Sequence, residues 1–167
     1  HGRTVRDGGG ITPDVVIEDR EYSRLTYALA AYGILEQYAM GYVCRHESSP
    51  PVAEFRLSDE EYEDFVQYAK GRDFDYRSTA KAYFDRMKAE LEKDGLAESL
   101  SGQLDTLAKS IEIEKEDFLR LKKDEIIPFL EEEIVVRYYF QEAGVKLRLR
   151  YDDVLKKALE SPLIDMR

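Results

Sequence analysis

Residues 115–143, KEDFLRLKKDEIIPFLEEEIVVRYYFQEA, carry the clearest helical pattern in the chain. Apolar side chains recur there at spacings of three and four residues, which place them on one face of a helix. Pro128 lies inside the stretch and lacks the N–H that continues a helix, so we expect a kink or a split near Glu125. Gly144 is expected to end the helix, and residues 147–150 to form a short extended or connecting piece.

The chain on either side of this stretch is also expected to be helical. Apolar periodicity predicts one buried helix from about Tyr22 to Arg45, and further helices that begin near Ser58, Ser78 and Leu96. The helix that begins near Ser78 is expected to stop at Asp94-Gly95. A last helix should run from about Tyr151 to Glu160. The sequence therefore predicts a mainly α fold, a helical domain of about five to seven helices.

Two further expectations concern the helix ends and the core. Ser58 is followed three positions later by Glu61, the spacing of a capping box at a helix N-terminus. The side chains expected to be largely buried are those that recur on the apolar helix faces. They are Leu29, Tyr32, Phe65, Phe84, Leu107, Leu130 and Ile134.

Residues 1–17 differ from the rest of the chain. Two short β-type runs, around residues 3–6 and 14–17, flank the glycine triplet Gly8–Gly10, which indicates a β-hairpin. We expect residues 1–17 to be a hairpin remnant and residues 18–167 to be the helical domain. Because the chain enters at His1 in the middle of this pattern, we expect it to be a piece of a longer protein. The hairpin strands should then hydrogen-bond to each other or to a neighbouring molecule.

Composition narrows the classes of partner. Hydrophobic residues make up 43% of the chain and charged residues 36%, and the formal net charge is −10. This charge opposes phosphate backbones and anionic lipid, so we expect neither nucleic acid nor a membrane surface as a partner. The longest apolar stretch, residues 25–44, is interrupted by Glu36 and Gln37, which favours a core helix over a membrane span.

The sequence contains three sets of residues with side chains that can act as nucleophiles or metal ligands. Ser78 and Lys81 have the Ser-x-x-Lys spacing, in which a lysine one helical turn away can take the proton of a serine nucleophile. No Ser-Asp-Asn or Lys-Thr-Gly element accompanies them, so a helix cap and a solvent-facing lysine are favoured. His46 and His1 are the only histidines, fewer than a metal site usually needs, so His46 is expected to be an exposed helix-end residue. Cys44 is expected to be a small buried apolar residue.

Two acidic triplets, residues 59–61 and 131–133, could suggest paired carboxylates. Consecutive helical residues point about 100° apart, so the triplets should not converge and are expected to form solvated faces. Pairs four positions apart, Glu133 with Arg137 and Glu116 with Arg120, fit that interpretation. The glycine triplet leads to Pro13 rather than to a helix N-terminus, so it is a turn and no phosphate cradle. We expect no catalytic residue, no cofactor and no metal site in this chain.

The run from Gly2 to Val5, followed by Gly8-Gly9-Gly10-Ile11-Thr12-Pro13-Asp14-Val15, is similar to a segment of the C-terminal processing peptidases. That family carries Gly-Arg, several residues and Gly-Ile-x-Pro-Asp-Val after its catalytic residues. The glycine triplet and helical tail look like the Bacteroidetes-type members, as do residues 54–62 and 137–141. The matching hairpin covers about a tenth of the chain, and the motifs in the tail are less specific.

This resemblance implies a parent hydrolase that cleaves proteins near their C-termini, with a serine nucleophile, a lysine base and a PDZ domain. In the family order the serine and the lysine precede the Gly-Arg segment, so neither role passes to a residue of this chain. The resemblance also implies a periplasmic or cell-envelope location. Its implied partners are the rest of the same protease chain, the parent's polypeptide substrate and, as a further expectation, a homo-oligomer. The chain would be an accessory region that supports the protease core or its assembly; the alternative is a free-standing helical interaction module unrelated to proteases.

Overall fold

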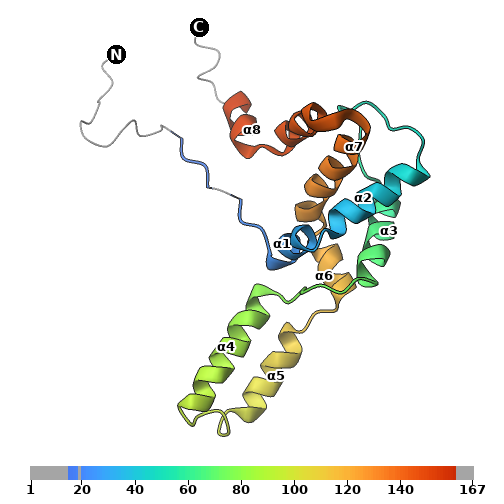
Figure 1. Ribbon diagram of the computed structural model, residues 1–167. Coiled ribbons are helices and arrows are strands. Elements are labelled where there is room, and N and C mark those ends of the chain that lie inside the picture. The colour runs from blue at the N-terminus through green and yellow to red at the C-terminus, as the bar shows by residue number, and fades with distance from the viewer. Residues whose placement is uncertain (1–14, 19, 161–167) are drawn as a thin grey trace, which may run out of the picture. The chain divides into compact units, whose positions relative to one another are not determined.

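The computed structural model describes residues 15–18 and 20–160. These residues form eight α-helices and no strand (Figure 1). The helices are α1 (Arg24–Ala31), α2 (Ile34–Arg45), α3 (Asp59–Lys70), α4 (Thr79–Lys93), α5 (Ser101–Ile111), α6 (Lys115–Leu121), α7 (Lys123–Tyr151) and α8 (Asp153–Glu160). The predicted mainly helical fold is confirmed, with one helix more than the upper end of the expected range. The chain divides into two compact units, and the larger one, Tyr22–Tyr151, contains α1 to α7.

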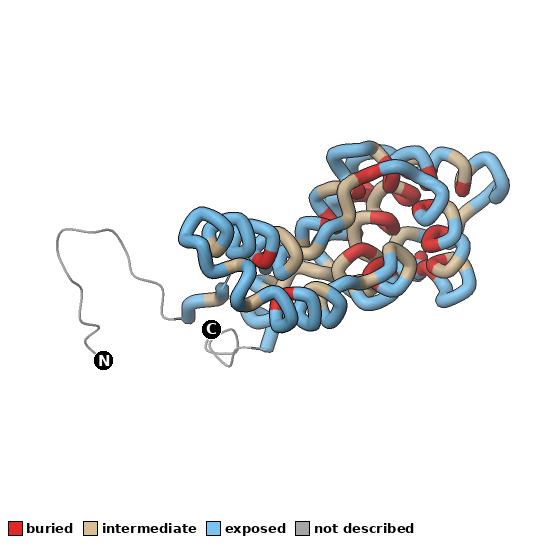
Figure 2. The backbone as a smooth tube through the Cα atoms, turned by 90° about the horizontal axis from the view of Figure 1, so that it is seen from below, coloured by how far each residue is buried: buried red, intermediate tan, exposed pale blue. Residues whose placement is uncertain are grey.

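The core of the larger unit lies among five of its helices, α1, α2, α3, α6 and α7, with α2 packed along α7. Figure 2 shows that most of the buried segments gather in one part of this unit. Fully or almost fully buried side chains include Leu25, Leu29, Tyr38, Phe55, Tyr62, Phe65, Leu119, Ile126, Leu130 and Ile134. Of the predicted core, Leu29, Phe65, Phe84, Leu130 and Ile134 are confirmed as buried.

The single helix expected over residues 22–45 is wrong, because the chain turns at Tyr32 and Gly33. Gly33 adopts a φ of 65°, a left-handed conformation that glycine reaches without the steric penalty of a Cβ. Tyr32 caps the end of α1 and is 53% exposed, so its predicted place in the core is wrong as well. The turn allows α1 and α2 to pack against each other.

The long helical stretch divides close to the expected position. The split predicted near Glu125 is found at Lys122, which caps α6, and Pro128 lies in the second turn of α7. The predicted start of α3 and the predicted end of α4 are also confirmed. Ser58 and Glu61 form the predicted capping box of α3. Gly95, with a φ of 72°, follows the last turn of α4 where a stop was expected.

Helix α7 contains a break that the sequence did not predict. Phe140 has φ 65° and ψ −175° and divides α7 into a first arm, residues 123–139, and a second arm, residues 141–151. The expectation that Gly144 ends the helix and that residues 147–150 are extended is wrong, because helix continues to Tyr151. Gly144 is buried, and a Cβ there would lie 2.6 Å from Cγ2 of Val136. Glycine is required for the close approach of the two arms rather than for termination.

Helices α4 and α5 pack against each other as a helical hairpin (Figure 1). None of their side chains belongs to the core cluster of the larger unit. Phe84 and Leu104 are buried between them, whereas Leu107 is 43% exposed, so its predicted burial is wrong. α5 begins at Ser101 instead of near Leu96, because residues 97–100 form a turn.

The smaller unit joins the described residues before Tyr22 with those after Tyr151, and includes α8. In it, Arg20 pairs with Asp153 at 2.6 Å. The β-hairpin expected over residues 1–17 lies mostly outside the described residues. Its described part, residues 15–17, forms no strand, and Val15 and Val16 are exposed. Over residues 15–18 and 20–160, no helix combines the length and apolar character needed to cross a membrane.

Candidate functional site

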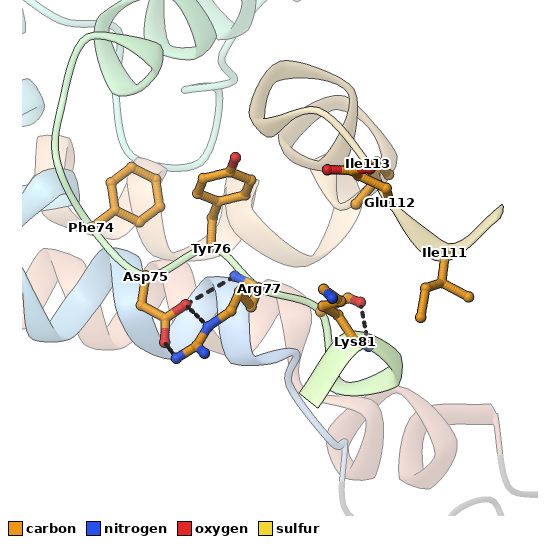
Figure 3. A pocket seen from close by; sticks show the side chains of 9 residues that line it. Phe74, Asp75, Tyr76, Arg77, Lys81, Ile111, Glu112 and Ile113 are labelled. Atoms are coloured by element: carbon orange, nitrogen blue, oxygen red, sulfur yellow. Dashed lines mark hydrogen bonds and ion pairs between the residues drawn. The ribbon is translucent and has the colours of Figure 1, made fainter. Parts of the chain in front are cut away.

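A cleft of about 250 Å³ opens where the α4–α5 hairpin joins the rest of the larger unit (Figure 3). One wall is the segment that connects α3 to α4, and the other is the segment that follows α5. The lining side chains are Phe74, Asp75, Tyr76, Arg77, Ser78, Lys81, Ile111, Glu112 and Ile113. Phe74 is buried in the core, so this wall is anchored to the main body of the unit.

The charged groups of the cleft are bound to each other. Asp75 accepts two side-chain hydrogen bonds from Arg77, at 3.0 and 2.8 Å, and one from the backbone N–H of Arg77 at 3.1 Å. These bonds lower the pKa of Asp75 from its usual value of 3.8 to about 2. Arg24 adds a weaker attraction at 3.7 Å. Asp75 therefore stays ionised near neutral pH and holds the loop in shape, which does not suit it to general acid–base chemistry.

Ser78 and Lys81 lie in this cleft as a helix cap. The hydroxyl oxygen of Ser78 accepts a hydrogen bond from the backbone N–H of Lys81 at 3.0 Å, so the predicted N-cap is confirmed. The Lys81 ammonium pairs with Asp85 at 2.8 Å and lies 5.2 Å from the Phe84 ring centroid. Lys81 is thus engaged along its own helix and does not simply point to water as expected. Ser78 and the backbone of Lys81 thus form a helix cap, and the side chains are not arranged as a nucleophile and its base.

Lys115 forms a contact that the sequence pattern did not indicate. Its ammonium donates to the carbonyl of Arg72 at 2.6 Å and to that of Lys70 at 3.3 Å, at the end of α3. A cation is favoured at a helix C-terminus, where carbonyl groups lack partners within the helix. The same ammonium lies 4.7 Å from the ring centroid of Phe74 and 5.2 Å from that of Tyr76. Lys115 therefore connects the end of α3 to the two aromatic side chains that line the cleft.

His46, the histidine considered as a metal ligand, and Cys44 lie at the end of α2; His1 lies outside the described residues. His46 caps that helix as an exposed residue, as expected, and its ring stacks on Tyr42 with centroids 4.1 Å apart. Its Nδ1 lies 2.9 Å from the carbonyl oxygen of Tyr42. Cys44 is exposed, so the expectation of a buried residue is wrong. Among the described residues, no three His, Cys, Asp or Glu side chains are grouped to hold a metal ion.

The second acidic triplet is not a solvated face throughout, because Glu131 is only 1% exposed. Its carboxylate accepts from Tyr151 at 2.7 Å, from Arg150 at 3.1 Å and from the backbone N–H of Leu57 at 3.0 Å. Arg150 also donates to the carbonyl of Val52 at 2.7 Å. This buried network holds the segment before α3 against both arms of α7. It shows a structural role for a triplet whose spacing gave no sign of burial.

The predicted surface pairs are partly confirmed. Glu133 binds Arg137 at 2.7 Å, as expected from their spacing. Arg120 does not pair with Glu116 but binds Glu63 at 2.6 Å, which links α6 to α3. Glu116 instead pairs with Lys70. Arg120 and Glu116 thus each pair with a residue on α3 instead of with each other. Sequence spacing alone cannot indicate such pairs between helices.

Comparison with known proteins places the chain in a family. Residues 25–161, well over half of the chain, match the family model described as the C-terminal helical domain of a probable PDZ-protease. No curated protein and no solved structure matches the chain significantly. The match agrees with the protease family that the sequence resembles and with the helical region predicted to follow the hairpin. It does not favour a free-standing module unrelated to proteases. The chain belongs to the family of C-terminal helical domains of probable PDZ-proteases.

Proposed function

We propose that this domain is a non-catalytic accessory domain of a C-terminal processing serine peptidase, where it supports the protease part of its own chain. The family match and the resemblance of residues 2–15 to the end of such a protease domain support this assignment. The parent would hydrolyse polypeptides near their C-termini in the periplasm or the cell envelope. Fractionation of cells that produce the parent protein tests the location.

The observation that carries the proposal is the exposed apolar surface of the α4–α5 hairpin. Tyr83 is 68% exposed, Met87 41% and Leu107 43%, on helices that add nothing to the core cluster. A hairpin without a share in the core does little for the stability of the main body. Exposed apolar side chains grouped on such an element are typical of a contact surface. The partner that fits the family is the protease part of the same chain.

The polar groups of the cleft support an accessory role in a second way. Asp75 is bound by Arg77, Ser78 caps α4, and Lys81 binds Asp85. Lys115 is bound to backbone carbonyls and faces two rings. Asp75, Ser78 and Lys81 are bound within their own segment, and Lys115 is bound to the end of α3. This use of the polar groups for local structure supports an accessory role rather than a catalytic one.

The test uses the full-length parent protein and two matched tyrosine variants. Tyr83→Ser alters the hairpin, and Tyr27→Ser alters a tyrosine of similar exposure, 63%, on α1. An interface aromatic is commonly worth more than about 1 kcal/mol, so Tyr83→Ser should slow cleavage of an unfolded polypeptide about fivefold if docking is required. Tyr27→Ser should leave the rate unchanged. Equal rates for wild type and Tyr83→Ser, together with unchanged thermal unfolding of the protease part, would contradict the proposal.

A further inference from the structure

The two arms of α7 face each other across Phe140. One close approach joins Val136 and Gly144, which lie at equal distances along the chain from Phe140. A second contact, between Glu132 and Arg148, is also symmetric about the same residue. The second arm thus folds back beside the first, and Phe140 is the only described residue of α7 with a non-helical backbone.

The backbone at Phe140 is strained. A φ of 65° with a ψ of −175° belongs to a region that essentially only glycine occupies. The ring is 80% exposed, so its packing within the domain does not hold this conformation in place. The flanking residues, 135–139 and 141–143, contain neither glycine nor proline, and they would continue a helix. A straight α7 would relieve the strain and satisfy the local sequence.

The second arm is nevertheless held in place by its bonds to the buried carboxylate of Glu131. Glu131 is buried and relies on Arg150 and Tyr151, both from the end of the second arm. A buried carboxylate that loses its partners is strongly destabilising. Simple opening of the arm is therefore unfavourable. It becomes favourable only when another Arg and Tyr at the same spacing reach Glu131, and a second copy of this chain carries them.

We propose that two copies of the chain exchange the second arms of α7. In each copy α7 becomes continuous through Phe140, and its residues 141–151 occupy the place of the partner's second arm, so that each Glu131 is bound by Arg150 and Tyr151 of the other copy. The exchange repeats every contact of the closed form and changes only the hinge. Such an exchange of identical elements gives a two-fold symmetric dimer.

The test places a cysteine on each arm. Val136→Cys and Gly144→Cys, made together with Cys44→Ser, put two thiols where the Gly144 Cβ position and Val136 Cγ2 are 2.6 Å apart, within the reach of a disulfide. The protein is unfolded, refolded at high concentration, separated by size and oxidised. The dimer fraction should form disulfides between chains, and the monomer fraction within one chain, as shown by non-reducing electrophoresis. A dimer in which the disulfides form only within each chain would overturn the proposal.

Two hinge variants give an independent readout. Phe140→Gly weakens a straight helix by a factor of about five at each hinge, and it also removes the strain of the bent form. The dimer dissociation constant should therefore rise by about 30-fold or more. Phe140→Ala removes the ring but keeps a Cβ, so it should dimerise like the wild type. A wild type that stays monomeric after concentrated refolding, or a dimer equally stable in both variants, would overturn the proposal.

Discussion

Glu131 accepts a hydrogen bond from Arg150 at 3.1 Å, although the two residues lie on different arms of α7. The carboxylate is also bound by Tyr151 and by the N–H of Leu57, and Arg150 reaches the carbonyl groups of residues 52, 53 and 55. Among the described residues, every buried side-chain nitrogen and oxygen has a hydrogen-bond partner. One ionised pair therefore joins three segments of the chain that are far apart in sequence.

Removing Arg150 should destabilise the domain far more than removing a surface arginine. Arg150→Met leaves a buried carboxylate without its cation, which should lower the free energy of unfolding by about 3 kcal/mol. Arg148→Met is the control, because Arg148 is 60% exposed in its pair with Glu132 and such pairs are worth less than about 1 kcal/mol. Urea denaturation measures both. Equal losses in the two variants would mean that the Glu131 network does not hold the arms.

Gly144→Ala should destabilise the domain in spite of the higher helix propensity of alanine. Its Cβ would lie 2.6 Å from Val136 Cγ2, and such overpacking costs about 1–3 kcal/mol, against a propensity gain of about 1 kcal/mol. Gly102→Ala on α5 is the control, since nothing lies within 4 Å of its Cβ position. Thermal unfolding should show a lower Tm for Gly144→Ala and an unchanged or higher one for Gly102→Ala. The opposite order would contradict the close approach of the arms.

Much of the fold could be predicted because its signals are local. The capping box of Ser58 and Glu61, the cap at Ser78 and the stop at Gly95 each depend on a few neighbouring residues. The break at Phe140 could not be predicted, because no glycine or proline marks it. It is imposed by contacts of the second arm with Val136 and Glu131, which are tertiary.

The errors in burial have a similar origin. Tyr32 and Leu107 have apolar spacing, but Tyr32 lies at the turn that ends α1, and Leu107 lies on a hairpin that has no part in the core cluster. Glu131 lies in a triplet of acidic residues, which is typical of a solvated face. It can be buried because Arg150, 19 positions further along the chain, binds its carboxylate. The cleft combines segments around residues 74–78 and 111–113, a juxtaposition that follows from the α4–α5 hairpin and from no motif.

Truncation of Leu130 tests the core directly. Leu130 is fully buried, and Leu130→Ala should cost about 2–5 kcal/mol through lost burial and the cavity left behind. Leu107→Ala removes the same atoms from a side chain that is 43% exposed and should cost about 1 kcal/mol or less. Denaturant titrations with a common slope compare the two. A loss below about 0.5 kcal/mol for Leu130→Ala would mean that α7 faces solvent there.

The pair between Glu63 and Arg120 should make part of the stability depend on pH. Hydrogen bonds from Arg120, with one from Gln67, lower the pKa of Glu63 from its usual value of 4.5 to about 2. The carboxylate thus contributes stability fully above its unfolded pKa, and the contribution is lost as the pH falls from 4.5 towards about 2. Arg120→Gln should therefore destabilise the domain more near neutral pH than at about pH 2, with a small, salt-sensitive effect. A difference independent of pH would contradict this assignment.

The proposed accessory role is tested most directly by a cleavage assay that compares this chain with its full-length parent. Both are incubated with an unfolded polypeptide, and the products are identified by mass spectrometry. We expect the parent to cleave the polypeptide near its C-terminus and this chain to leave it intact. Ser78→Asn in the parent keeps a good helix cap while removing the hydroxyl, so its cleavage rate should equal that of the wild type. Cleavage by this chain alone that disappears on Ser78→Asn would contradict the account.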